Sequence, residues 1–229
     1  MGASANPPWV VRIDPVTGDV TSIAVPPVPA RPAVTEDAVW VLCPDDGSLS
    51  RIDPVTNELV ATIPVGRGPS GMAVGAGAVW VTSSRDGTVA RIDPATGRVV
   101  ATIPVGRAPG GLTVAGGAVW VALPDRGGLG RLDPATGRVV ARVPLPRTTD
   151  QEPHQVAVGD GAVWVTSASP RGGTANLLWR VDPASNQVTS TTDLGPTAAG
   201  GLPNDVAAAY GAVWAAGADL DSLFRVQPG

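Results

Sequence analysis

Residues 78–97 read AVWVTSSRDGTVARIDPATG, and two parts of this stretch recur along the whole chain. The tripeptide Ala-Val-Trp occurs five times, beginning at Ala38, Ala78, Ala118, Ala162 and Ala212, so that successive copies are 40, 40, 44 and 50 residues apart. The pattern Arg-hydrophobic-Asp-Pro begins at Arg12, Arg51, Arg91, Arg131 and Arg180. A period of about 40 residues filled with short β-rich runs indicates a β-propeller, in which each repeat is one blade of four strands.

We therefore expect an all-β protein, a β-propeller of about five four-stranded blades in a single domain, residues 1–229. The approximate blade boundaries are 27–67, 68–107, 108–147, 148–200 and 201–229, the last being completed by 8–26. We expect the N- and C-terminal strands to pair and close the ring, because an open ring leaves two edges that favour aggregation. This scheme leaves one strand spare, so self-association through unpaired terminal strands is the alternative.

Within one repeat the four strands, called a to d from the channel outward, are expected at 71–74, 78–82, 88–92 and 98–105. The c–d turn is Asp93-Pro94-Ala95-Thr96-Gly97. Its aspartate can accept backbone N–H groups, its proline presets φ, and its last residue must adopt a positive φ. That last position is occupied by Gly18, Asn57, Gly97, Gly137 and Asn186 in the five copies, which are the two residue types that tolerate a positive φ best.

The tryptophan of each Ala-Val-Trp has two possible roles, an aromatic cage for a ligand or a wedge between neighbouring blades. Its identical placement in all five repeats, next to small apolar residues, favours the wedge. The repeated Asp-Pro is interpreted as turn chemistry and not as a ring of metal ligands. These residues are predicted to belong to the scaffold.

The composition excludes several classes of partner. The formal net charge is -4 and all 16 basic residues are arginine, so no basic stripe is available for nucleic acid. No apolar run approaches the roughly 20 residues of a membrane span, and the first eight residues do not resemble a signal peptide. We expect a cytoplasmic protein or a secreted domain without its signal, and we expect the single Cys43 to be a buried thiol with no role.

The repeat is irregular at three places, and all three lie on one face. The b–c loop of blade four is longer by an insertion around 167–175, and the d–a connections are longer at 147–155 and 193–205. In an antiparallel blade the b–c and d–a loops emerge on the same side, whereas the c–d turns lie on the other side. Insertions in repeat proteins often mark the binding face.

The same face carries the unusual polar residues. Each blade has a proline nine residues before its Ala-Val-Trp, at the entrance to strand a, and these are Pro29, Pro69, Pro109, Pro153 and Pro203. Blades two and three supply only small residues after it, namely Ser70, Gly71, Gly110 and Gly111. The other blades form a polar arc at the channel mouth, consisting of Arg31, Glu152, His154, Gln155, Asn204 and Asp205. Arg31, Gln155, Asn204 and Asp205 are the candidate ligand-binding residues, unless the arc is only a solvated loop.

Units such as GTVARIDPATGRVVATIPVG at 87–106 resemble the bacterial YVTN-type propeller repeats and are similar to those of virginiamycin B lyase-like propellers. The lyase resemblance implies a seven-bladed ring and Mg²⁺-assisted elimination that opens a cyclic ester. By this resemblance Glu152 would hold the metal and His154 would be catalytic, because Glu152-Pro153-His154 matches the family's Glu-Pro-His motif. The family's second histidine is replaced by Gly110.

Three hypotheses about function follow. The leading one is a non-enzymatic β-propeller, without a cofactor, that binds an unknown protein or small-molecule ligand at the channel mouth through the d–a and b–c loops of blades four and five. The alternative is a metal-assisted lyase or hydrolase with Glu152, His154 and Mg²⁺. The third is a purely structural module of a larger protein.

Overall fold

The chain folds into a curved row of separate antiparallel sheets in a computed structural model that describes residues 8–146, 151–168, 176–195, 203–217 and 222–227. Four of the sheets contain four strands, one contains three and one contains two. Each four-stranded sheet is one blade of the predicted propeller.

The strands of the four complete blades run in chain order from the inner to the outer edge. Blade one contains β3 (Ala30–Val34), β4 (Val39–Cys43), β5 (Ser48–Ile52) and β6 (Leu59–Pro64). Blade two contains β7 (Pro69–Gly75), β8 (Ala78–Ser83), β9 (Thr88–Asp93) and β10 (Arg98–Pro104). Blade three contains β11 (Leu112–Ala115), β12 (Ala118–Leu123), β13 (Gly128–Leu132) and β14 (Val139–Pro144). Blade four contains β15 (Glu152–Gly159), β16 (Ala162–Ala168), β17 (Leu177–Asp182) and β18 (Gln187–Asp193).

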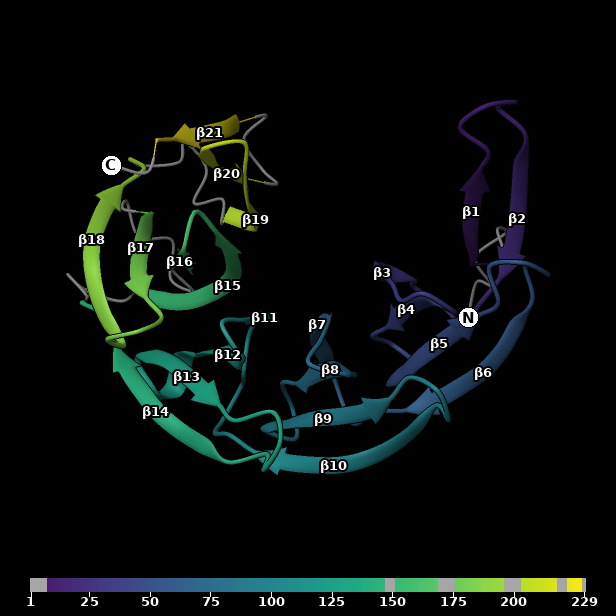
Figure 1. The fold of residues 1–229 in the computed structure, drawn as a ribbon, viewed down its shortest axis with the longest axis horizontal. Coiled ribbons are helices and arrows are strands. Elements are labelled where there is room, and N and C mark those ends of the chain that lie inside the picture. The colour runs from purple at the N-terminus through teal and green to yellow at the C-terminus, as the bar shows by residue number, and fades with distance from the viewer. Residues whose placement is uncertain (1–7, 147–150, 169–175, 196–202, 218–221, 228–229) are drawn as a thin grey trace, which may run out of the picture.

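The two remaining sheets lie at the ends of the row. Blade five contains β19 (Pro203–Ala209), β20 (Ala212–Gly217) and β21 (Ser222–Val226), and the N-terminal hairpin contains β1 (Trp9–Ile13) and β2 (Val20–Ala24). Figure 1 shows the first strand of every blade facing a common centre, with a gap in the circle between blade five and the hairpin. The strands predicted for the second repeat are confirmed, because β7 to β10 differ from them by no more than two residues at any end.

The c–d turns have the predicted chemistry. In blade two the Oδ1 atom of Asp93 accepts the N–H groups of Ala95 at 2.8 Å and Thr96 at 3.2 Å. The last turn residue adopts a positive φ in every copy, namely 76° at Gly18, 59° at Asn57, 64° at Gly97, 67° at Gly137 and 57° at Asn186. The sequence constraint and the backbone therefore agree at all five turns.

The tryptophans pack between blades, as predicted. Trp80 is fully buried in a cluster that also contains Val119 and Val121 of the next blade. Trp40, Trp120 and Trp164 lie at the equivalent junctions and are at most 2% exposed. The arginine of the neighbouring strand c lies over each indole, for example Arg91 at 5.6 Å from the centre of the Trp80 ring, which adds a cation–π contact to the apolar packing.

The expected closure of the ring is not formed by the described strands. The hairpin β1–β2 is a sheet of its own, and β21 is the outermost strand of blade five. Ile23 and Val25 of the hairpin instead pack in one buried cluster with Val41 and Cys43 of blade one. The hairpin corresponds to strands c and d of a repeat, and these strands pack on the following blade, so its position is set by blade one and not by blade five.

Cys43 is buried, as predicted, and its exposed fraction is zero. Burial raises the pKa of this thiol, because a thiolate is poorly solvated inside the protein. The described residues contain one short helical turn, η1 (Pro124–Arg126), so they provide no helix with the length and apolar character needed to cross a bilayer.

Candidate functional site

The b–c and d–a loops do lie together on one face. Asp86, in the b–c turn of blade two, accepts hydrogen bonds from Arg67, which lies in the connection from blade one to blade two. The long insertions that drew attention to this face fall largely at 147–150, 169–175 and 196–202, which are outside the described residues. The site is therefore built from the strand entrances and the shorter loops.

Two of the candidate ligand-binding residues meet at the channel mouth although they are far apart in the sequence. Nη1 of Arg31, on β3, lies 4.0 Å from Oδ1 of Asp205, on β19. The Arg31 side chain is 36% exposed and the Asp205 side chain is 72% exposed. The innermost strands of the first and fifth blades are thus connected by an ion pair that solvent reaches from outside.

Glu152, His154 and Gln155 lie at the entrance of β15, where the sequence pattern placed them. Glu152 and His154 are half-buried, whereas Gln155 is only 6% exposed and its N–H donates to Oγ1 of Thr166 at 3.3 Å. Asn204 lies within β19, and its side chain is not among those described. The structure therefore places Gln155 at the junction with blade three, next to Gly111, while Arg31 and Asp205 are accessible to solvent.

The small residues of blades two and three have a structural role. The N–H of Gly111 donates to the carbonyl oxygen of His154 at 2.7 Å, which ties strand entrances of neighbouring blades together. A Cβ atom at Gly110 would lie 2.6 Å from that same carbonyl oxygen. A histidine at position 110 is therefore incompatible with this backbone, and the glycine permits the close approach of the two blades.

The described part of the mouth offers few of the groups that hold Mg²⁺ in a protein. Mg²⁺ takes octahedral oxygen coordination, usually through one or two carboxylates with water in the remaining positions. Among the side chains that the structure describes, no three His, Cys, Asp or Glu residues converge. The described part of the mouth thus offers Glu152 and His154 without a third ligand from these residue types.

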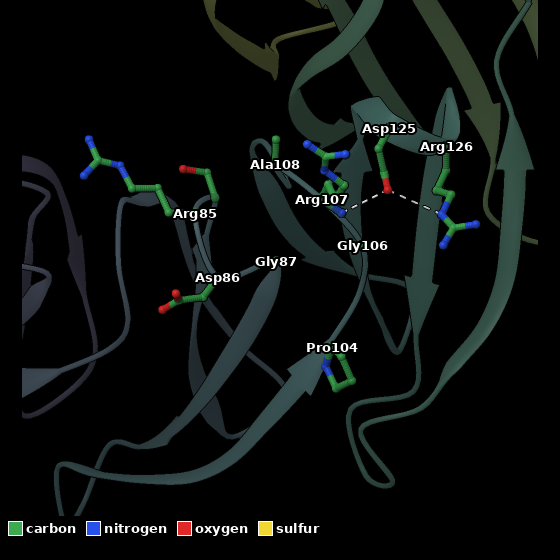
Figure 2. Close-up of a pocket in the computed structure, with 10 residues that line it drawn as sticks. Arg85, Asp86, Gly87, Pro104, Gly106, Arg107, Ala108, Asp125 and Arg126 are labelled. Atoms are coloured by element: carbon green, nitrogen blue, oxygen red, sulfur yellow. Dashed lines mark hydrogen bonds and ion pairs between the residues drawn. The ribbon is translucent and has the colours of Figure 1, made fainter.

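A cleft of about 590 Å³ opens on the loop face between blades two and three (Figure 2). Its walls are the b–c turn of blade two, the connection from β10 to β11, and η1 of blade three. Figure 2 shows Asp125 joined to both Arg107 and Arg126, while the guanidinium of Arg85 points away from those two. The cationic groups thus border the cleft without converging on one point.

The carboxylates around this cleft are already engaged by the scaffold. Oδ2 of Asp86 accepts the N–H of Arg67 at 2.7 Å and Oδ1 accepts its Nε at 2.7 Å. These hydrogen bonds, the one from the Arg67 backbone first, hold the pKa of Asp86 below its ordinary value. Asp125 repeats the arrangement one blade later, accepting the N–H of Arg107 at 2.9 Å. The turn of each of these blades therefore fastens the connection that leads into it.

This cleft was not predicted from the sequence. The signal was present in the dipeptides Gly66-Arg67 and Gly106-Arg107, which follow the Ile-Pro-Val of strand d, each with an aspartate in the next b–c turn. The two Gly-Arg dipeptides occupy equivalent positions in the repeat, but the two aspartates occupy different positions within their turns. Only the fold shows that they perform the same task.

No family model and no curated protein matches this sequence. Solved structures do match: a Kuenenia stuttgartiensis hydrazine synthase at a TM-score of 0.66 and 16% identity, over 78% of this chain and 52% of that one. A streptogramin B lyase matches at a TM-score of 0.61 and 16% identity, over 91% of this chain and 83% of that one. A Myxococcus xanthus glutaminyl cyclase matches at a TM-score of 0.53 and 15% identity, over 84% of this chain and 86% of that one.

These similarities establish the fold of the chain and nothing about its function, because sequence identities of 15–16% carry information on fold alone. The chain has a β-propeller fold of the kind found in the streptogramin B lyase, which confirms the architecture that the repeats and the resemblance indicated. The chain spans about half the length of the hydrazine synthase chain it matches, at 52%.

Proposed function

We propose that this propeller is a non-enzymatic binding module that takes a ligand or a partner at the channel mouth and on the loop face of blades four and five. The observation that carries the proposal is the Arg31–Asp205 pair, in which residues from the two ends of the repeat array come together at the mouth. Glu152, His154 and Gln155 lie at the entrance of β15, and Asn204 lies at the entrance of β19 beside Asp205.

The Arg31–Asp205 ion pair can be replaced by ion pairs with a ligand at little cost in stability. At 4.0 Å and with both side chains accessible to water, it contributes little to the stability of the fold. A ligand carboxylate can replace Asp205 beside the guanidinium, and a ligand ammonium can replace Arg31 beside the carboxylate. A zwitterion such as an amino acid or a short peptide satisfies both groups at once.

The loop face offers further contact area away from the mouth. The cleft between blades two and three lies on the same face, and its scaffold hydrogen bonds keep the loops in place without a ligand. The side chains of Arg85 and Arg107 make no hydrogen bond or ion pair with the described residues. A partner that covers the mouth can therefore also contact these arginines.

The proposal is tested by thermal unfolding with a panel of free amino acids and dipeptides. A ligand at a hundredfold its dissociation constant adds about 2.7 kcal/mol to the stability of the protein, which shifts the melting midpoint. We expect a ligand that stabilises the wild type to stabilise Asp37→Ala equally and to leave Arg31→Ala/Asp205→Ala unshifted. Asp37 is a matched control because it also pairs with an arginine, Arg51 at 3.2 Å, but in the a–b turn on the opposite face.

Equal shifts in all three proteins would show that the mouth is not the binding site. The same assay with Mg²⁺ separates the metal-assisted lyase alternative. We expect no shift of the wild-type midpoint with Mg²⁺, since no three His, Cys, Asp or Glu side chains converge among the described residues. A shift present in the wild type and absent in Glu152→Ala and His154→Ala would restore the alternative.

A further inference from the structure

The cleft between blades two and three carries an excess of positive charge, although the formal net charge of the chain is -4. Its charged lining residues are Arg85, Asp86, Arg107, Asp125 and Arg126. We propose that this cleft binds an extended acidic peptide segment, whose carboxylates pair with Arg85 and Arg107. The proposal is independent of the ligand site at the channel mouth.

Both aspartates of the cleft are already paired with other arginines. Oδ1 of Asp86 lies 2.7 Å from Nε of Arg67. Oδ2 of Asp125 lies 3.4 Å from Nε of Arg126. The two carboxylate side chains are only 27% and 19% exposed, so they are largely covered as well as compensated. They therefore repel an acidic ligand only weakly.

Arg85 and Arg107 carry the charge that is not compensated. Both residues are exposed, and neither side chain makes a hydrogen bond or an ion pair with the described residues. A guanidinium group presents a planar fork of N–H groups that matches the two oxygens of a carboxylate. Such charge-assisted pairs are stronger than hydrogen bonds between neutral groups. Carboxylates are thus the chemistry that these two side chains recognise.

The positions of the two arginines favour an extended ligand over a small anion. In Figure 2 they lie on either side of Ala108, and the guanidinium of Arg85 points away from that of Arg107. A single phosphate or sulfate does not bridge two groups that diverge in this way, whereas carboxylates spaced along a peptide can reach both. Pro104 and Ala108 are exposed in the cleft, so an apolar residue between the acidic ones can pack there.

The positive charge is local, which argues for a peptide and against a nucleic acid. The b–c turn of blade one lies on the same face and carries Asp45 and Asp46, both exposed. The described loops therefore form no continuous basic stripe of the kind that follows a phosphate backbone. A short acidic segment needs only the cleft itself.

The loops that carry the two arginines are held in place by the scaffold. The N–H of Arg107 donates to Oδ2 of Asp125 at 2.9 Å. The N–H of Arg85 donates to the carbonyl oxygen of Arg67 at 3.2 Å. Because ordering of loops opposes binding, a backbone that is already fixed favours affinity, and only the guanidinium side chains need to be ordered by the ligand.

The probe is a fluorescent synthetic peptide, GEDVEDG, in which a valine separates two acidic pairs. We expect saturable binding of one peptide per chain, measured by fluorescence polarisation at low ionic strength and weakened by added salt. The double variant Arg85→Gln/Arg107→Gln should weaken binding about tenfold, because it removes two exposed ion pairs. Its melting midpoint should equal that of the wild type, since neither side chain has a partner among the described residues.

The matched control is Arg98→Gln/Arg138→Gln. It removes the same charge from two exposed arginines that follow the c–d turns of blades two and three, on the opposite face, and should bind as the wild type does. The amide peptide GQNVQNG should not bind.

The proposal is overturned if the wild type does not bind GEDVEDG, if the amide peptide binds equally well, or if both double variants bind like the wild type. Loss of binding in Arg31→Ala/Asp205→Ala alone would place the peptide at the channel mouth and would also overturn it. Tighter binding of inorganic phosphate or of single-stranded DNA than of the peptide would contradict the proposed ligand chemistry.

Discussion

Blade two and blade five are built from the same repeat, but they differ in how much of it is buried. In blade two, Trp80 and Val89 are fully buried between β7–β10 and the following blade. In blade five, Trp214 is half-buried and Leu223 is 63% exposed, although both occupy the equivalent positions. The local structure is alike, since Arg225 lies over Trp214 at 5.6 Å just as Arg91 lies over Trp80 at 5.6 Å.

This difference shows that the repeat specifies a blade and that the neighbouring blade creates the core. Each blade presents its tryptophan face to the next blade and a valine face to the previous one. The apolar surface of a blade is therefore only half buried until a neighbour is present on each side, as in other repeat proteins. The hairpin mirrors blade five at the other end, where Val11 is 51% and Ile13 is 63% exposed.

The largest expected effect is at the tryptophans. Trp80→Ala should lower the free energy of unfolding by about 3–5 kcal/mol, because it leaves a large cavity between two blades. Trp214→Ala should lower it by about 1–2 kcal/mol, since that side chain has a blade on one side only. Urea denaturation followed by far-UV circular dichroism measures both. Equal losses would contradict the conclusion that the neighbouring blade, and not the repeat, makes the core.

A smaller contrast is expected at two turn glycines with a similar backbone. Gly18 in the hairpin has a φ of 76° and Gly87 in blade two has a φ of 71°. A Cβ atom at Gly18 would have no atom within 4 Å, whereas at Gly87 it would lie 2.6 Å from the carbonyl oxygen of Gly106. Gly18→Ala should cost about 1–2 kcal/mol for the positive φ alone, and Gly87→Ala about 2–4 kcal/mol in urea denaturation. A larger loss at Gly18 would contradict this interpretation.

The smallest effect concerns local opening of the N-terminal end. Cys43 is covered by Ile23 and Val25 of the hairpin, and burial raises the pKa of its thiol, so it should react slowly with a thiol reagent at neutral pH. Ile23→Ala should increase the labelling rate about tenfold by loosening the hairpin. Ile103→Ala is the matched control, because both isoleucines are 7% exposed at equivalent positions. A similar rate increase in the control would mean that Cys43 reports on global unfolding instead.

The sequence was sufficient for the elements that depend on short-range chemistry. The period of the Ala-Val-Trp copies predicted the blades, and the Asp93–Gly97 turn with its positive φ at the last residue is confirmed. The wedge role of Trp80 was also predictable, because one residue type at the same place in every repeat needs a shared structural reason. All of these signals lie within about one repeat of the chain.

The candidate site could be predicted only in part. The sequence placed Arg31 and Asp205 on one rim but gave no reason to expect them within 4.0 Å of each other. From the sequence, Gly110 was interpreted only as a small residue at the rim. In the structure, that glycine permits the close approach of His154 of the next blade. The aspartates that fasten the connections between blades were not identified, since their partners lie in another repeat.

What the sequence determined by itself is the blade: its strands, its turns and its tryptophan wedge, each set by residues that are close together in the chain. Only the tertiary structure decided how the blades are arranged relative to one another. The pairing of Arg31 with Asp205 depends on the curvature that accumulates over successive blade junctions, whereas the hairpin is placed by its packing on blade one. Each junction sets a small rotation through side-chain packing, and it is the sum of these rotations that brings the ends of the array together or leaves them apart.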